Sequence, residues 1–323
     1  MNPETAQDAV PLEDVHETHG PDASGMTTHI FYAFNTVITL QAFGHPERCR
    51  TAFDAARAAS RLFERRFSRT LPHSDIARLN AAGGARVAIG PDTADLLRIA
   101  LRYCEDSEGR FDITMGAVVR LWNFHDGRVP DQAAIAEALP HVDWRRIRVW
   151  EEDGQSFAQV SDPQAAVDAG GIAKGWIADR LVEVMAAHGI DTFIVNLGGN
   201  VVAHGTKPNG APWRVGLQDP HDKNAIVGAV EVRNASAVTS GVYERCFTKD
   251  GVFYHHILDP LTGYPAKTDA AGATVVAQRS IDAEGYSTTL LALGIERGMA
   301  FARKHPAILH AYFVDTDGAV HEA

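Results

Sequence analysis

Short stretches rich in β-branched and aromatic residues, separated by turn-forming residues, fill the chain between residues 192 and 276. Each stretch predicts a strand, because such side chains pack well on a pleated surface. The predicted strands cover residues 193–196, 201–204, 213–217, 227–232, 235–238 and 252–257. The earlier part of the chain instead carries apolar residues at helical spacing. Helices early and a meander of strands later predict an α+β fold with an antiparallel-sheet core, rather than alternating strands and helices.

Outside that region the sequence predicts a mixture of helices and strands. A strand over residues 30–43 is followed by a helix that begins after Pro46, with Ala52, Ala56 and Ala59 on one face. Further predicted helices cover residues 74–80, 92–107, 172–188, 281–294 and 296–305. Further predicted strands cover residues 147–150, 157–160, 165–167 and 309–314.

The N-terminal stretch differs from the rest of the chain. It is acidic, contains Pro and Gly, and has no apolar period, so we expect a flexible tail over residues 1–27. No later linker is strong enough to divide the chain, which predicts one compact domain over residues 28–323. The N-terminus has no basic segment, apolar segment or lipid-bearing cysteine, and no apolar stretch approaches membrane-spanning length. We therefore expect a cytoplasmic protein without a membrane segment.

Charge and cysteine content exclude several classes of function. The formal net charge is −11, and no sustained run of Lys and Arg occurs, which argues against a nucleic-acid binder. A small phosphorylated ligand remains compatible with this charge, because one lysine, a metal ion and backbone N–H groups are sufficient to bind it. The three cysteines, Cys49, Cys104 and Cys246, are far apart, so they suggest neither a zinc site nor a disulfide framework.

The segment Val167-Asp-Ala-Gly-Gly-Ile-Ala-Lys-Gly-Trp176 combines features of an anion-binding site. A predicted strand ends at Asp168, two glycines allow a tight backbone path, and Lys174 lies in the first turn of a predicted helix. Free N–H groups and the helix dipole attract anions at such a helix start. The alternative interpretation is a helix-entry turn with a surface lysine. The segment does not have the G-x-x-x-x-G-K-[ST] pattern of a P-loop.

Two further segments are less specific. Asn196-Leu-Gly-Gly199 runs from a strand into a double glycine, which allows a sharp bend or the close approach of a ligand, but an ordinary hairpin turn explains it equally well. In the segment 254–265 a strand presents His256 on one face, with Asp259 in the following turn. A histidine near a carboxylate is suited to remove a proton from a hydroxyl group, although an ordinary hydrogen-bonded histidine is the alternative.

The last segment is Ala283-Glu-Gly-Tyr-Ser-Thr-Thr289, which we predict to lie in a helix. Glu284 and Thr288 are four residues apart, so their side chains lie on the same helix face. A carboxylate and a hydroxyl are oxygen ligands of the type that Mg²⁺ prefers. A solvated glutamate beside an ordinary helical threonine is the alternative.

In this order the segments resemble the FAD:protein FMN transferase family, the ApbE-like flavin transferases, from about residue 34 to residue 313. Any one of them is ordinary, but the ordered set is hard to obtain by chance. The resemblance lies in Gly109-Arg-Phe-Asp-Ile-Thr114 with Leu121-Trp122, Asp168 to Gly175, Asn196 to Gly199, Trp213 to Gly216, Asp219-Pro220, Thr239-Ser-Gly241, Tyr243-Glu-Arg245 and His256 to Pro260 with Thr262-Gly263.

The resemblance implies an ApbE-like flavin transferase fold with FAD in a cleft, and it assigns roles to particular residues. The residues expected at the flavin are Phe34, Arg110, Phe111 and Asp112. Asp168 and Lys174 are expected near the flavin and the diphosphate, and His256 beside the reacting phosphate. His256 and Lys174 would carry the chemistry. The expected Mg²⁺ ligands are the Gly171 carbonyl, Glu284, Thr288 and, as a weaker candidate, Ser287.

The implied reaction is the Mg²⁺-dependent transfer of FMN from FAD to a Thr or Ser hydroxyl of an acceptor flavoprotein, with release of AMP. Two positions depart from the family pattern. The first strand carries Phe34-Asn-Thr36 where many members have Met-Gly-Thr, and Glu284 stands where the family has a metal-binding aspartate. The extra methylene of Glu284 moves the carboxylate by roughly 1.5 Å.

Two alternatives remain open on sequence grounds. One is an FAD diphosphatase, in which water attacks the same phosphorus to give FMN and AMP. The other is a module that binds FAD without chemistry, an interpretation that the change at Glu284 keeps open. A dinucleotide-binding dehydrogenase is disfavoured, because no G-x-G-x-x-G lies between a strand and a helix.

Overall fold

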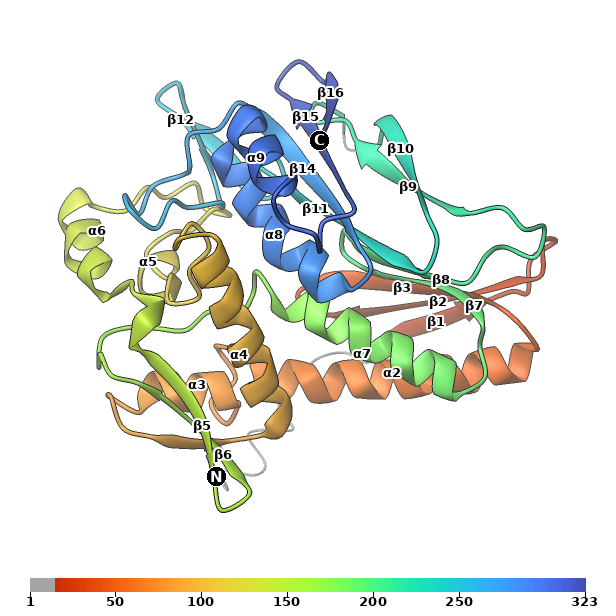
Figure 1. Cartoon of the computed structure of the whole chain (residues 1–323), viewed down its shortest axis with the longest axis horizontal. Coiled ribbons are helices and arrows are strands. Elements are labelled where there is room, and N and C mark those ends of the chain that lie inside the picture. The colour runs from red at the N-terminus through yellow and green to blue at the C-terminus, as the bar shows by residue number, and fades with distance from the viewer. Residues whose placement is uncertain (1–14, 223) are drawn as a thin grey trace.

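An antiparallel sheet forms the centre of the fold (Figure 1). The structure is a computed structural model that describes residues 15–222 and 224–323. Within these residues the main sheet has nine strands, in the order β1-β2-β3-β7-β8-β11-β14-β15-β16. They are β1 (His16–His19), β2 (Met26–Ala33), β3 (Thr36–Phe43), β7 (Thr192–Leu197), β8 (Asn200–His204), β11 (Ala235–Gly241), β14 (Ala270–Ala277), β15 (His310–Asp315) and β16 (Val320–Glu322).

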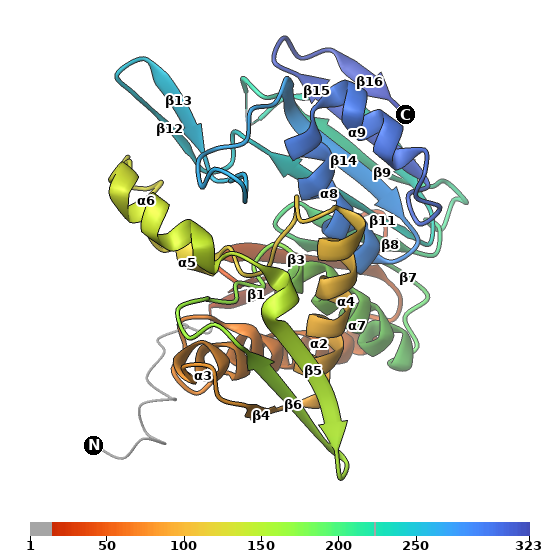
Figure 2. The same cartoon turned by 60° about the vertical axis from the view of Figure 1, so that its left-hand side comes forward.

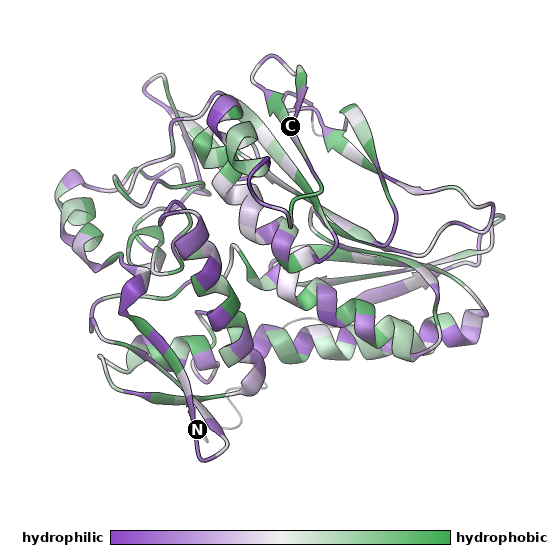
Figure 3. Cartoon of the chain, in the orientation of Figure 1, coloured by the Kyte–Doolittle hydropathy of each residue, from purple (hydrophilic) through white to green (hydrophobic). Residues whose placement is uncertain are grey.

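Helices α2 (Pro46–Phe67), α7 (Ala173–Ala187), α8 (Ser280–Leu293) and α9 (Ile295–Ala302) pack beside this sheet and on one another (Figures 1 and 2). In α2 the buried residues recur at helical spacing, which gives the helix one apolar side. Figure 3 shows the corresponding alternation of hydrophobic and hydrophilic residues along α2. Helix α8 contacts both β11 and β14, and α7 lies between α8 and α2.

A hairpin of β9 (Trp213–Gln218) and β10 (Ile226–Val232) covers the opposite side of the sheet. Its apolar residues form a second core cluster with residues of β8, β11, β14 and β15, among them Trp213, Leu217, Ala237 and Val276. Alternate residues of β11 therefore face different partners, since successive side chains of a strand point to opposite faces. Ser236 and Ser240 contact α8, whereas Ala237 belongs to the cluster under the hairpin.

The remaining elements lie at one end of this core, on the left in Figure 1. They are α3 (Asp75–Ala81), β4 (Val87–Ile89), α4 (Pro91–Asp106), α5 (Gly116–Val119), α6 (Gln132–Ala138), the 3₁₀ turns Leu139–His141 and Trp144–Arg146, β5 (Ile147–Glu152), β6 (Gln155–Val160), β12 (Cys246–Lys249) and β13 (Val252–His255). Strands β4, β6 and β5 form a small sheet, and β12 and β13 form a hairpin. A third apolar cluster connects α5 and α6 to that hairpin through Trp122, Phe247 and Tyr254.

The structure confirms the predicted α+β class and most of the predicted elements, but two predicted strands were wrong. Residues 30–43 form two strands, not one, because Phe34 and Asn35 both adopt positive φ and reverse the chain between β2 and β3. Paired positive φ values are typical of a tight hairpin turn. Residues 165–167 form no strand; Ala166 makes only an isolated bridge to Met115.

The predicted tail and domain boundary also need correction. Residues 1–14 lie outside the described residues, but His16–His19 form β1, paired with β2, and β2 begins at Met26. Within the described residues, strand structure is therefore present before the predicted boundary at residue 28. Strands β12 and β14 were not predicted, although β14 lies within the main sheet. Among the described residues, no helix is long and apolar enough to cross a membrane.

Candidate functional site

The first turn of α7 crosses α8 at Gly175. A Cβ atom at this position would lie 2.7 Å from the Cβ of Glu284 and 2.7 Å from the Ser280 carbonyl oxygen. Only glycine therefore allows the two helices to approach this closely. The crossing places Lys174, one residue earlier, against the side chain of Glu284.

The Glu284 carboxylate is buried between these helices and the sheet, with 4 % of the residue exposed. Lys174 Nζ donates a hydrogen bond to Oε1 and forms an ion pair with it. Asn200 Nδ2, at the start of β8, donates to Oε2 over 2.5 Å. A buried carboxylate requires such partners, because an unpaired buried charge is very costly. The structure thus brings together Lys174 and Glu284, which are 110 residues apart in the sequence.

Two hydroxyl groups, those of Ser287 and Thr288, lie one turn further along α8, and a third, that of Ser240, faces them from β11. Ser287 Oγ lies 2.9 Å from Ser240 Oγ, and Thr288 Oγ1 lies 3.3 Å from the same Ser240 oxygen. Ser287 also donates to the Glu284 carbonyl over 3.2 Å. Gly171 lies just before α7, where an added Cβ would be 3.2 Å from the Phe111 ring.

The α8 carboxylate and the two α8 hydroxyls are oxygen donors of the kind that suits Mg²⁺. The Gly171 carbonyl belongs to the loop before α7, and the contact described for Gly171 is with Phe111. The described part of the chain contains no cluster of three or more His, Cys, Asp or Glu side chains that could bind a metal. A cation at this site would accordingly depend on a single carboxylate, together with neutral oxygens and ligand or water oxygens. Such a donor set is typical for Mg²⁺, which usually retains waters and contacts substrate phosphates.

Asp168 lies in the loop that leads into α7. Its Oδ1 accepts from Gly170 N over 2.8 Å, and its Oδ2 forms an ion pair with Arg69 Nε at 3.1 Å. Burial lowers the pKa of Arg245. Arg245 lies close enough to Asp168 for the negative charge of Asp168 to oppose this shift. The loop before α7 therefore contains a carboxylate that pairs with the guanidinium group of Arg69 and interacts electrostatically with that of Arg245. Such a group of charges suits a ligand with both hydrogen-bond donors and phosphate oxygens.

His256 follows β13 and is adjacent to this cluster. Its backbone N donates to the Arg245 carbonyl over 3.1 Å. Burial lowers its pKa to about 3, and the nearby positive charges of Arg245 and Lys174 contribute to the shift. Among the described residues, its buried Nδ1 has no hydrogen-bond partner. His256 is therefore neutral at physiological pH and retains an unused ring nitrogen.

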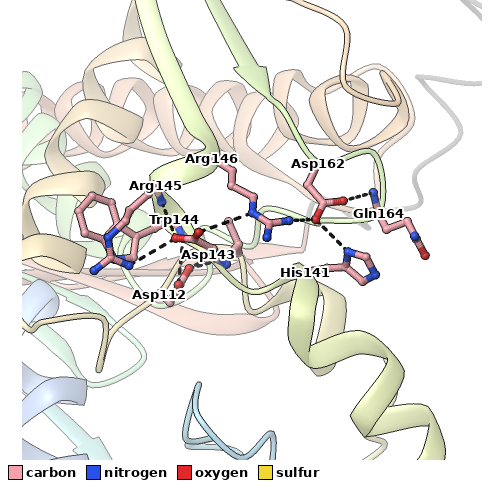
Figure 4. A network of polar contacts seen from close by, with 9 residues as sticks. Asp112, His141, Asp143, Trp144, Arg145, Arg146, Asp162 and Gln164 are labelled. Atoms are coloured by element: carbon pink, nitrogen blue, oxygen red, sulfur yellow. Dashed lines mark hydrogen bonds and ion pairs between the residues drawn. The ribbon is translucent and has the colours of Figure 1, made fainter.

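The predicted flavin residues near residue 111 belong to a braced loop. Asp112 is buried, and burial raises its pKa. Its Oδ1 accepts from the N and Oγ1 atoms of Thr114, and its Oδ2 accepts from Trp144 N over 3.2 Å. Figure 4 shows this contact within a polar network that includes Arg146 and Asp162. Asp112 thus has internal partners for both oxygens.

Phe111 and Arg110 differ in their surroundings. Phe111 is buried in the main core and contacts Gly171, so the braced loop reaches the start of α7. Arg110 is only half-buried. The contact of Phe111 brings one predicted flavin residue against one predicted metal ligand.

Phe34 lies in the turn between β2 and β3. Its N–H donates to Glu64 Oε1 over 2.7 Å, which fixes this turn on α2. The next strand begins at Thr36, and a Cβ added to Gly198 would overlap the Thr36 side chain. The first turn and the predicted double-glycine turn therefore meet at one end of the sheet, the end at which β8 begins with Asn200.

A pocket of about 290 Å³ opens at this end, under the β9–β10 hairpin. It is lined by Ile194, Asn196, Gly199, Val201, Arg214, Val215, Gly216, Gln218, Thr239, Tyr243 and Glu244. Several of these belong to segments that the sequence analysis singled out. The pocket lies on the β9 side of the sheet, whereas Glu284 lies on the α8 side.

Sequence reasoning did not assign a role to Asn200, Ser240, Arg69 or Arg245, although all four contact or influence predicted site residues. Ser240 and Arg245 lie within segments that carry the family resemblance, so that resemblance could have identified them as candidate site residues. Asn200 directly follows the double glycine, but its partner is 84 residues away. Nothing in the sequence around Arg69 indicated a contact with Asp168.

Comparison with known proteins gives a consistent result. Residues 34–313 match the ApbE family. The chain is 41 % identical over 266 residues to the FAD:protein FMN transferase of Treponema pallidum, covering 76 % of this chain and 72 % of that protein. It is 32 % identical over 298 residues to one from Klebsiella pneumoniae, covering 88 % and 89 %. The solved structure of the ApbE protein from Thermotoga maritima superposes with a TM-score of 0.83 at 26 % identity, covering 95 % and 97 % of the two chains.

Proposed function

This chain belongs to the ApbE family, and on that basis we propose that it is a Mg²⁺-dependent FAD:protein FMN transferase. Its substrates are FAD and an acceptor flavoprotein with a target Thr or Ser. The products are AMP and an acceptor that carries FMN in a phosphoester bond. The similarity to proteins named FAD:protein FMN transferase, over most of their length, supports this assignment.

One structural observation supports the proposal most strongly. The carboxylate of Glu284 and the hydroxyls of Ser287 and Thr288 lie within about one turn of α8, and the carboxylate contacts the Lys174 ammonium group at the start of α7. We assign Glu284, Thr288, the Gly171 carbonyl and, as a weaker ligand, Ser287 to Mg²⁺. When bound, Mg²⁺ would neutralise charge on the diphosphate and on the leaving phosphate.

The residues of this chain provide fixed charges around the diphosphate. In the reaction the bond between the FMN phosphorus and the bridging oxygen breaks, and AMP leaves with the electron pair. A bond forms between the same phosphorus and the acceptor hydroxyl oxygen. Negative charge is spread over the phosphate oxygens during this exchange. We assign its stabilisation to Lys174, whose ammonium group contacts Glu284 in the ligand-free chain.

His256 is assigned as the base that takes the proton of the acceptor hydroxyl. A base must be unprotonated at the working pH and within hydrogen-bond reach of the proton. The lowered pKa keeps the ring neutral, and the ring lies close enough to Lys174 and Arg245 for their charges to contribute to that shift. We assign to the flavin side of the site the residues Phe34, Arg110, Phe111, Asp112 and Asp168. For Asp112 the assignment is indirect, because its carboxylate already accepts hydrogen bonds within its own loop and from Trp144.

The proposal is tested by incubating the purified protein with FAD and following AMP and FMN by chromatography, with Mg²⁺ or with EDTA. We expect AMP to appear only with free Mg²⁺. Intact FAD under both conditions, also after addition of an acceptor, would support a binding module instead. Free FMN formed in equal amount to AMP, with no flavin on any acceptor, would support an FAD diphosphatase.

A further inference from the structure

A chain of buried polar side chains extends from Glu284 away from the proposed metal ligands. Asn200 Nδ2 donates to Glu284 Oε2 over 2.5 Å, and Asn200 is 1 % exposed. Ser280 Oγ donates to Asn200 Oδ1 over 2.7 Å. Ser236 Oγ lies 3.1 Å from Ser280 Oγ and also donates to the Val201 carbonyl over 3.0 Å. Ser280 and Ser236 are fully buried.

This arrangement determines which way the Asn200 amide faces. An ionised carboxylate only accepts hydrogen bonds, so the amide NH₂ group must face Glu284. The amide oxygen then faces Ser280, whose hydroxyl supplies the matching donor. Asn200 is therefore held from both sides, in a strand that pairs with β7 and β11.

The two oxygens of Glu284 consequently have different environments. Oε2 is bound by the rigid Asn200 amide, whereas Oε1 contacts the flexible Lys174 side chain, which is about a quarter exposed. A lysine can move aside because its ammonium group sits on a long, flexible stem. Oε1 is thus the oxygen that a cation can reach without displacing a buried partner.

We propose that Asn200 is a positioning residue that fixes Glu284 Oε2 and so presents Oε1 to the metal. The inference rests on the proposed function, because it requires that Glu284 bind Mg²⁺. Glutamate has one more rotatable bond than aspartate, and an unrestrained carboxylate would lose more freedom when it binds the metal. Partners that orient a metal ligand typically contribute about 10-fold to 100-fold in metal affinity.

The test measures Mg²⁺ affinity of the FAD-free protein by calorimetry, without any turnover. We expect Asn200→Ala to weaken Mg²⁺ binding by about 10-fold to 100-fold. Ser280→Ala, which removes only the donor to the amide oxygen, should weaken it less. This second variant also keeps the inference testable if Asn200→Ala does not fold. Thr93→Val serves as the matched control, because it removes a hydroxyl donor from another buried carboxylate, that of Asp75.

A double-mutant cycle separates positioning from a merely structural role. In a Glu284→Ala background, Asn200→Ala should have no further effect on any Mg²⁺ binding that remains measurable, although both changes can lower the melting temperature. If Glu284→Ala abolishes Mg²⁺ binding while Asn200→Ala and Ser280→Ala bind as tightly as the unchanged protein, the positioning role is wrong and the metal site stands. If Glu284→Ala binds Mg²⁺ normally, or the unchanged protein binds none, the proposed metal site itself is wrong.

Discussion

At Glu284 the chain carries a carboxylate that is one methylene longer than the aspartate expected from the family pattern. The structure shows that this side chain bridges Lys174 and Asn200. We expect Glu284→Ala to lower Mg²⁺-dependent AMP release by more than about 100-fold, because it removes the only carboxylate of the proposed metal set. Glu284→Asp should keep at least the original rate. AMP release is measured by chromatography, and an alanine variant with full activity would remove Glu284 from the site.

His256 makes a second prediction, on the dependence of stability on pH. Its pKa is about 3 in the folded chain, against an ordinary value of 6.5. Between these values the unfolded chain binds more protons, so the free energy of unfolding falls as the pH is lowered through this window. Well above pH 6.5 both states are unprotonated at this residue, and it has no further effect.

We therefore expect His256→Gln to reduce the loss of stability between about pH 7.5 and pH 5, measured as the shift of the urea midpoint. The exposed His125 provides the control, and His125→Gln should leave the pH dependence unchanged. A His256→Gln variant with the same pH dependence as the unchanged protein would contradict the burial of a neutral histidine at this site.

The sequence indicated individual candidate residues but not their partners in the fold. Lys174, Glu284 and Thr288 were predicted from local patterns and family resemblance, and the structure brings Lys174 and Glu284 into direct contact. Asn200 was not predicted, because its role depends on Glu284, which is 84 residues away. The spacing of residues along the sequence carries no information on such a tertiary contact, and an asparagine after two glycines is typical of a turn.

At the scale of elements, the crossing of α7 and α8 positions the site. Gly175→Ala would place a methyl group 2.7 Å from Glu284 Cβ and 2.7 Å from the Ser280 carbonyl oxygen. We expect it to destabilise the fold by about 1–3 kcal/mol, because close-packed elements tolerate added volume poorly. It should also weaken Mg²⁺ binding, since Glu284 must move. Both are measured, by urea unfolding and by calorimetry.

Gly228→Ala in β10 is the matched control. Its nearest contact would be Leu217 Cδ1 at 3.5 Å, an ordinary van der Waals distance. We expect a change in stability of less than about 1 kcal/mol and no change in Mg²⁺ affinity. Equal effects of the two alanine variants would mean that the crossing at Gly175 does not position Glu284.

Helices with a clear periodicity of apolar residues or a capping residue were predicted well. A strand buried on both faces and a turn with an unusual backbone conformation were not. The apolar face of α2 and the Ser74 cap of α3 are local features, and both helices were predicted. Strand β14 is buried over all eight of its residues, so it lacks the alternation that marks a half-buried strand, and its alanines and glycine have low strand propensity. The turn at Phe34 was hidden because a phenylalanine with positive φ is unusual.

At the scale of the whole molecule, the sequence predicted the α+β class from the order of helices and strands, and the structure confirms it. The sequence could not predict that the Phe34 turn, the Gly198–Gly199 turn and the start of β8 lie close together at one end of the sheet. That convergence depends on strand order in the sheet, in which β3 pairs with β7 and β8 with β11. Pairing between distant strands is set by packing of the complete core.

The most direct test of the central claim is to follow covalent flavin on an acceptor. The purified protein is incubated with FAD, Mg²⁺ and a candidate acceptor flavoprotein, and flavin fluorescence is recorded after denaturing electrophoresis. Parallel samples contain EDTA or an acceptor whose target Thr is replaced by Val. Transfer predicts fluorescence on the unchanged acceptor only with Mg²⁺, and one AMP for each flavin attached. Release of AMP and free FMN with no flavin on the acceptor would contradict transfer and identify hydrolysis as the reaction.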